Sequence, residues 1–322
     1  MSKNIQPYKC AFSINHSLLN LTCDIAYKAG VLENEGFFPN PEDKISGVKT
    51  IVELKGGHLT PSQFKGLANG ERLPNNEVAN AFASIYQRLA RLDPFDESFI
   101  QLFEESYFIE GVPNRMGRKA EDFPFPLPLT PRIAPMMKGL FSFLKGSIGK
   151  THPLILSGMA YVEILSIAPY SKGNEALALL LSKAILTRYT KTFLYLPLEE
   201  NLHKKRDLLY KAIEEGSERA DLSGFLLVYL EVLSASLRSL SLRREKKNKE
   251  TSAQVKRLLA VMEEGKFYGA NELCEMLGLK SRLGLMKNYI NPALASHLIK
   301  RSDPTSPTSR NQRYGKVKKD EE

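Results

Sequence analysis

The chain has 322 residues, of which 43% are hydrophobic and 25% are charged, and it carries a formal net charge of +9 at pH 7. This composition predicts a globular protein with room for two domains and excludes a wholly disordered chain. The positive charge favours non-specific contact with polyanions. Because the first residues lack a signal-peptide core and no uninterrupted apolar stretch reaches the ~18 to 20 residues that span a bilayer, we expect a cytoplasmic protein without membrane contact.

Cysteine and histidine usage favours neither a disulfide framework nor a metal centre. Cys10, Cys23 and Cys274 are odd in number and far apart, which predicts buried free thiols. The five histidines show no zinc-ligand spacing. His152 is expected at the start of a helix, and His203 lies among basic residues that predict a solvated face.

Helical periodicity dominates the first 250 residues and predicts an almost wholly α-helical fold. The prolines of 123–131 (FPFPLPLTP) predict an extended connection. Aliphatic residues from Leu177 to Ile185 recur at helical spacing and predict a core face. The predicted helices cover 77–91, 96–107, 131–145, 152–167, 174–190, 199–214 and 221–247.

A charge run at 243–250 (RREKKNKE) predicts a domain boundary, after which Thr251 and Ser252 are expected to cap a new helix over 252–264. A short helix within 269–279, a third helix from Ser281 and a pair of short strands within 302–317 are expected to follow. The predicted divisions are an N-terminal arm or extension at 1–45, a helical domain at 46–250, a second domain at 251–317 and a charged tail at 318–322.

The most informative segment is Ala168–Leu179 (APYSKGNEALAL), which connects two apolar helical runs. Pro169 and Gly173 interrupt the helical pattern before the second helix opens near Asn174. Gly173 permits an unusual backbone angle, and unpaired N–H groups at a helix start suit an anionic ligand. The pattern predicts a helix, a loop and a helix, with a weak signal for phosphate binding.

This loop resembles the signature of the Fic (Fido) family, H-P-F-x-[D/E]-G-N-G-R-x-x-R, whose members transfer AMP from ATP to a target hydroxyl. The chain keeps Pro169, Gly173 and Asn174, and Tyr170 replaces the family's Phe. The resemblance extends over about 45 to 235. It implies an all-α Fic/Fido helical core with a small β-hairpin flap.

The same resemblance implies that the catalytic groups are missing. In the family, the His accepts a proton, the acidic residue holds Mg²⁺ and the two Arg residues hold phosphates. These positions are occupied here by Ala168, Lys172, Ala176 and Leu179. Loss of a general base alone lowers a rate about 10²- to 10⁴-fold, so we expect no catalytic residue in this loop.

Glu175 replaces the family's second glycine and places a carboxylate where a nucleotide phosphate would lie. A negative side chain competes with an anion for the N–H groups of the helix start, so we expect weak or absent ATP binding. In the alternative, Lys172 pairs with a phosphate beside Gly173 and Asn174, and ATP and Mg²⁺ are then required.

Two further segments resemble regulatory parts of the family. Residues 52–60 (VELKGGHLT) correspond to its I-E-G-N-x-L-T segment, with Lys55 in place of the inhibitory Glu. Residues 112–122 correspond to the flap, which implies that a protein or peptide partner docks there by strand pairing.

Residues 251–317 resemble the winged helix-turn-helix module that follows the Fic core, with 291–299 and 310–314 as the matching segments. Leu283, Leu285 and Met286 crowd the helix that would enter a DNA groove, so a protein-interaction or packing role stays open beside DNA binding. The candidate DNA contacts are Lys280, Arg282, Lys287, Arg310, Arg313 and Lys316.

Two classes of function follow. The chain is a non-catalytic Fic-fold module with a binding or regulatory role, or it is a residual nucleotidyltransferase that acts on a protein hydroxyl. A DNA-binding regulator is a further alternative. Oligomerisation is possible because the apolar helix at 221–242 suits an interface as well as a core.

Overall fold

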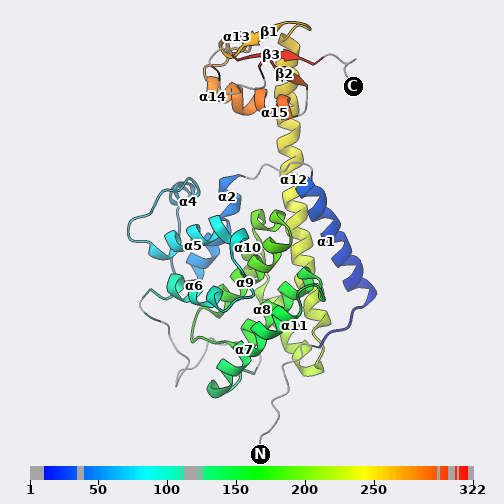
Figure 1. Cartoon of the computed structure of the whole chain (residues 1–322). Helices are drawn as coiled ribbons and strands as arrows, with labels where there is room; N and C mark the ends of the chain where they lie inside the picture. Colours follow the sequence, from blue (N-terminus) through cyan, green and yellow to red (C-terminus); the bar gives the residue numbers. More distant parts are fainter. Residues whose placement is uncertain are drawn as a thin grey trace, which may run out of the picture. The chain divides into compact units, whose positions relative to one another are not determined.

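The structure is a computed structural model that describes residues 11–34, 40–109, 111, 123, 126–295, 298–303, 309 and 312–317, without the side chains of 242–252 and 295. The chain divides into two compact units, residues 1–240 and 241–322, and each is mainly helical (Figure 1). The all-α prediction is therefore confirmed.

The helices of unit 1 follow the predicted order closely. The predicted helices at 77–91, 96–107, 131–145, 152–167 and 174–190 all form, and Pro153 and Thr130 open two of them. The elements are α1 His16–Asn34, α2 Pro41–Lys44, α3 Gly47–Leu54, α4 Pro61–Ala68, α5 Glu77–Arg88, η1 Leu89–Arg91, α6 Ser98–Tyr107, α7 Thr130–Gly146, α8 Pro153–Ile167, α9 Asn174–Tyr189, η2 Lys191–Tyr195, α10 Leu198–Lys204, α11 Arg206–Arg219 and α12 Ser223–Val261.

Helices α8 and α9 form the centre of unit 1 and are surrounded by its other helices (Figure 1). Nearly every residue of both helices is buried, which explains why they are apolar on all sides rather than along one stripe. The Tyr229 hydroxyl of α12 donates to Ser157 Oγ of α8 at 3.1 Å and also lies against the Ser182 hydroxyl of α9. A polar contact thus joins three core helices.

Helix α1 packs on the same core, so residues 16–34 of the expected N-terminal arm or extension belong to unit 1. The Thr192 hydroxyl donates to the carbonyl oxygen of Ala29 at 3.1 Å.

Cys23 is exposed on α1, so the prediction of a buried thiol is wrong at this position, whereas Cys274 is partly buried.

Two predicted helix limits are wrong. The expected helix 199–214 is broken at Lys205, between α10 and α11. The periodicity does not reveal this break because buried Leu202 and Leu209 stay two turns apart.

Helix α12 runs unbroken through 243–250, so Thr251 and Ser252 do not cap a new helix. Lys, Arg and Glu are good helix formers, so a run of these residues does not by itself stop a helix.

Residues Ser223–Ser241 of α12 are long and apolar enough to cross a membrane, with a mean hydropathy of 1.3. More than half of this window, 56%, is buried inside the protein. Phe225, Leu226 and Leu233 lie in the core of unit 1. This segment therefore has the burial of a core helix.

Unit 2 has its own core, which includes Leu258, Leu273, Ile290 and Tyr314. Its sheet is antiparallel with strand order β1-β3-β2, and Tyr268 of β1 and Arg301 of β2 both pair with Tyr314. The elements after α12 are β1 Phe267–Gly269, α13 Ala270–Met276, α14 Arg282–Leu285, the π-helical turn Met286–Ile290, α15 Asn291–Ala295, β2 Ile299–Arg301 and β3 Arg313–Lys316.

The sequence predicted only a pair of strands in this unit and missed β1. The segment is three residues long and ends at Gly269, directly before α13, so its pattern merges with the start of that helix. The predicted third helix is divided by the π-helical turn but continues to Ala295.

Candidate functional site

The loop between α8 and α9 has the geometry that the sequence predicts. Ala168 ends α8 in the left-handed region at φ 45°, and Gly173 precedes α9 at φ 90°. The buried Asn174 amide closes the loop, since its Oδ1 accepts the Tyr170 N–H and its Nδ2 donates to the Tyr170 carbonyl oxygen, both at 2.9 Å. Asn174 therefore supports the loop backbone directly.

Aromatic side chains cover the start of α9. A Cβ placed on Gly173 would lie 2.6 Å from Tyr107 Cε1 and 3.3 Å from Phe108 Cζ. Phe108 also meets the ring of Tyr170 at a centroid distance of 4.9 Å. The side of Gly173 where a Cβ would lie is thus occupied by two rings, directly before the predicted anion site.

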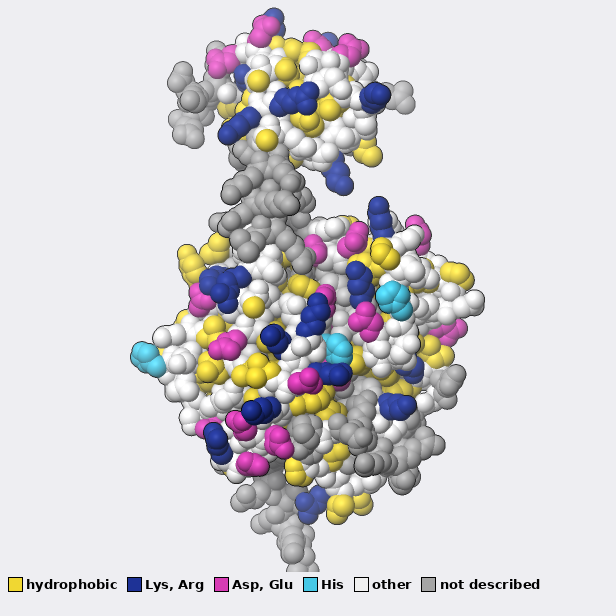
Figure 2. Space-filling view, turned by 180° about the vertical axis from the view of Figure 1, so that it is seen from behind, with side chains coloured by type: hydrophobic (Ala, Val, Ile, Leu, Met, Phe, Trp, Pro, Cys, Tyr) yellow, Lys and Arg dark blue, Asp and Glu magenta, His cyan; other side chains and the backbone are white. Residues whose placement is uncertain are grey.

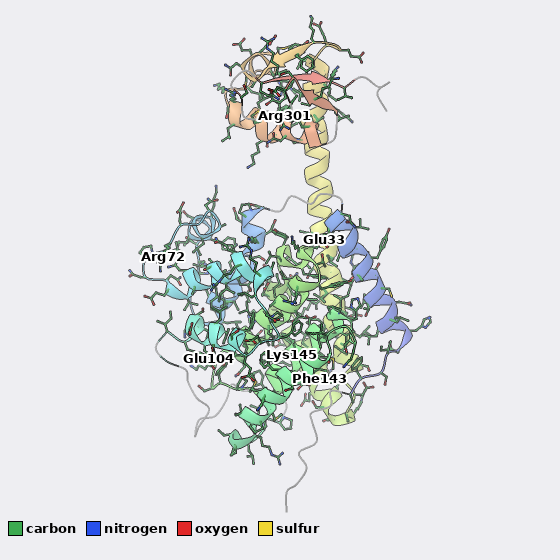
Figure 3. All side chains as sticks on the ribbon, in the orientation of Figure 1. Glu33, Arg72, Glu104, Phe143, Lys145 and Arg301 are labelled. Carbon is green, nitrogen blue, oxygen red and sulfur yellow. The ribbon has the colours of Figure 1, made fainter. Side chains whose placement is uncertain are left out.

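The aromatic cover is held from two sides. The Lys55 ammonium donates to the Tyr107 carbonyl oxygen at 2.9 Å and lies 4.9 Å from the centroid of the Tyr107 ring. On the other side, the Tyr170 hydroxyl donates to Glu104 Oε1 at 2.8 Å, and Figure 3 labels Glu104 on α6. Burial, and then this hydrogen bond, raise the pKa of Tyr170. Lys55, predicted at the position of the inhibitory Glu, therefore fixes the end of α6.

Glu175 is buried in the first turn of α9 and pairs with His203 of α10, with 2.7 Å between Oε1 and Nδ1. The prediction that His203 belongs to a solvated face is wrong, because its side chain is only 26% exposed. The hydrogen bond to Glu175 raises the pKa of His203, and partial burial opposes this shift. The Glu175 carboxylate is therefore engaged by a side chain.

The four positions that the resemblance aligns with the family's chemical groups divide into two kinds. Ala168, Ala176 and Leu179 are each 0% exposed and belong to the packed interior. Lys172 is exposed on the loop, one residue before Gly173. Arginine at either buried helix position would require its guanidinium to leave water, so the local packing there suits the apolar residues present.

His152 accepts the N–H of Leu154 at 3.2 Å through Nδ1 and caps α8, as predicted. Burial lowers its pKa.

Tyr161 of α8 is fully buried, and its hydroxyl has no hydrogen-bond partner among the described residues. Burial raises the pKa of Tyr161, and the nearby Glu175 carboxylate adds to the shift.

A buried ion pair in the same core was not found from the sequence. Lys183 of α9 and Glu199 of α10 are both 0% exposed, with 3.1 Å between Nζ and Oε2. Burial lowers the pKa of Lys183, and the Glu199 carboxylate opposes this shift. The signal available was a single Lys inside the apolar run 174–190, but its partner 16 residues away is not visible in a local pattern.

The candidate nucleic-acid contacts lie in unit 2. Lys280 and Arg282 are exposed at the start of α14, where the Ser281 hydroxyl accepts the Gly284 N–H, and Lys287 is exposed in the π-helical turn that follows. Arg313 is exposed on β3. The space-filling view shows basic and hydrophobic side chains together on one face of this unit (Figure 2). Arg310 and the expected flap at 112–122 lie outside the described residues.

Comparison with known proteins identifies the fold. A crystal structure of a Fic family protein from Desulfovibrio desulfuricans G20 matches with a TM-score of 0.62 and 23% sequence identity, over 98% of this chain and 100% of that chain. The chain has the fold of a Fic family protein. In addition, residues 253–315 match the family described as filamentation induced by cAMP protein Fic-like, C-terminal domain. No curated protein matches the sequence.

Proposed function

We propose that this chain is a catalytically silent Fic-fold protein with a binding or regulatory role. The observation that carries the proposal is the aromatic cover on Gly173, formed by Tyr107 and Phe108. The N–H groups of a helix start bind phosphate only if the ligand reaches them. Here the Tyr107 and Phe108 rings lie next to Gly173, directly before those N–H groups, and the adjacent Glu175 is paired with His203.

The residues at the chemical positions support the same proposal. Ala168 has no group that accepts a proton, and Lys172 carries the wrong charge to bind Mg²⁺. Ala176 and Leu179 are enclosed in the core and offer no phosphate donor. Replacement of a single phosphate or oxyanion donor lowers a rate about 10²- to 10³-fold. The Fic fold thus persists here with a different set of interactions.

Calorimetric titration of the full chain with ATP and Mg²⁺ tests this proposal. We expect no heat of binding, because the aromatic cover and the paired carboxylate leave no anion site at the loop. Micromolar binding that is lost in Lys172→Ala would contradict the proposal and support the residual nucleotidyltransferase. A matched control is Lys205→Ala, which removes an exposed cation between α10 and α11.

A second candidate function is DNA binding through unit 2, read as a winged helix. It rests on three exposed cations, Lys280 and Arg282 at the start of α14 and Lys287 in the π-helical turn after it. Leu283 of α14 is 78% exposed and favours a protein partner. If DNA binds, Lys280→Gln with Lys287→Gln should lower the slope of log affinity against log salt by about 2.

The control for that measurement is Lys138→Gln with Lys145→Gln, which removes two exposed cations from α7. Fluorescence anisotropy with labelled duplexes at several salt concentrations gives the slopes. Equal slopes for both double variants would show that Lys280 and Lys287 make no phosphate contact.

A further inference from the structure

A hollow face of unit 1 lies outside the loop. Cavities of about 580 Å³ and 410 Å³ lie along α4, α5 and α6, and Glu105 and Ile109 line both. Neither is lined by a residue of the 168–175 loop. Figure 3 labels Arg72 and Glu104, one from each cavity. We call this surface the acidic groove and define it by its charged residues Glu71, Arg72, Glu77, Glu104 and Glu105.

The charge of the acidic groove is opposite to that of the chain. It contains four carboxylates and one guanidinium, whereas the whole chain carries +9. Glu71, Glu77 and Glu105 make no ion pair with any described residue. Exposed acids elsewhere do pair with lysine, as in Asp24 with Lys28. Among the described residues, the four carboxylates and one guanidinium therefore give the groove an excess of negative charge.

A hydroxyl group that lines the groove also makes no hydrogen bond among the described residues. Ser106 of α6 is 8% exposed and lines the larger cavity, and its hydroxyl makes no hydrogen bond to a described residue. The Asn80 amide in the same cavity is already engaged, since it exchanges hydrogen bonds of 2.8 Å with the Leu73 backbone. Ile109 adds an apolar surface that is 48% exposed.

We propose that the acidic groove binds a basic peptide segment of a partner protein. Lys or Arg side chains of the peptide pair with Glu77 and Glu105, a peptide polar group bonds the Ser106 hydroxyl, and an apolar peptide side chain covers Ile109. Carboxylates on a rim select cationic partners by charge complementarity, and the cavity provides the space for side chains. The proposal does not depend on whether the loop binds nucleotide.

Fluorescence anisotropy of the full chain tests the groove with a short labelled peptide of alternating arginine and leucine. The comparison peptide has glutamate at each arginine position. We expect only the basic peptide to bind, and Glu77→Gln with Glu105→Gln should weaken its binding about 3- to 30-fold, since each exposed ion pair contributes modestly. Ser106→Leu, which places a larger apolar side chain in the cavity without a change of charge, should weaken binding as well.

The matched control is Glu214→Gln with Glu218→Gln, which removes two carboxylates from α11. It should leave the affinity within about 2-fold of the unmodified chain. Thermal unfolding of each variant shows whether it is folded. Absence of binding, equal weakening by both double variants, or spermidine binding as tightly as the peptide would each overturn the proposal.

Discussion

The buried Lys183–Glu199 pair allows a quantitative test of how the core around the loop is held. Glu199 lies between Lys183, at 3.1 Å, and the Tyr86 hydroxyl, which donates to it at 2.6 Å. The Lys183 ammonium also donates to the Leu196 carbonyl oxygen. The network connects α5, α9 and α10, and α3 packs closely against it, since a Cβ on Gly47 of α3 would lie 2.1 Å from the Tyr86 hydroxyl oxygen.

Lys183→Met removes one charge and leaves the Glu199 carboxylate buried with Tyr86 as its remaining side-chain partner. Breaking a fully buried pair from one side destabilises a protein by about 3 to 5 kcal/mol. For a unit of this size, about 2 to 4 °C of melting temperature corresponds to 1 kcal/mol. We therefore expect the melting temperature of Lys183→Met to fall by about 6 to 20 °C.

The double variant Lys183→Met with Glu199→Gln removes both charges and should be clearly more stable than Lys183→Met, because no unpaired charge stays in the core. Urea unfolding followed by circular dichroism gives the free energies, and the double-mutant cycle gives the coupling. Lys204→Met, in an exposed pair with Glu200, serves as control with an expected loss below about 1 kcal/mol. A loss below about 1 kcal/mol for Lys183→Met as well would refute the reasoning.

Three further predictions concern the loop. The pKa of His203 in the folded protein lies above 6.5, so its ion pair with Glu175 stabilises the fold fully below about pH 6.5 and progressively less as the pH rises through the folded value. The free energy of unfolding lost in His203→Gln, measured by urea titration, should therefore shrink as the pH rises. Gly173→Ala should lower stability by at least about 1 kcal/mol, since an L-residue is strained at φ 90° and its Cβ meets Tyr107; an unchanged melting curve would contradict the observed cover. Asn174→Ala should cost about 2 to 4 kcal/mol in chemical denaturation by leaving a buried N–H and C=O unbonded, and a loss under about 0.5 kcal/mol would mean that water replaces the amide.

The sequence predicted the central helices and the loop well because their signals are local. Pro153 opens α8 and Gly173 precedes α9, and the apolar run that follows each of these residues is longer than a typical β-strand. The break at Lys205 was missed because the spacing of Leu202 and Leu209 continues across it. Local patterns thus located the elements but not every limit.

The contacts around the loop could not be predicted because they join distant residues. Lys55 is 52 residues from Tyr107, and Glu175 is 28 residues from His203. Each partner alone has an ordinary local explanation, such as a solvated Lys or a favourable acid at a helix start. Only the packing of α3, α6, α9 and α10 brings these groups together.

The loop also shows that its shape and its chemistry depend on different residues. Asn174 and Gly173 set the backbone, through the bonds to Tyr170 and the left-handed angle, and both match the family signature. The positions that differ from the signature, such as Ala168 and Leu179, make no contribution to those bonds. The bend therefore depends on Gly173 and Asn174, which match the signature, and not on the positions that differ from it, while the rings that lie next to Gly173 come from Tyr107 and Phe108 at the end of α6.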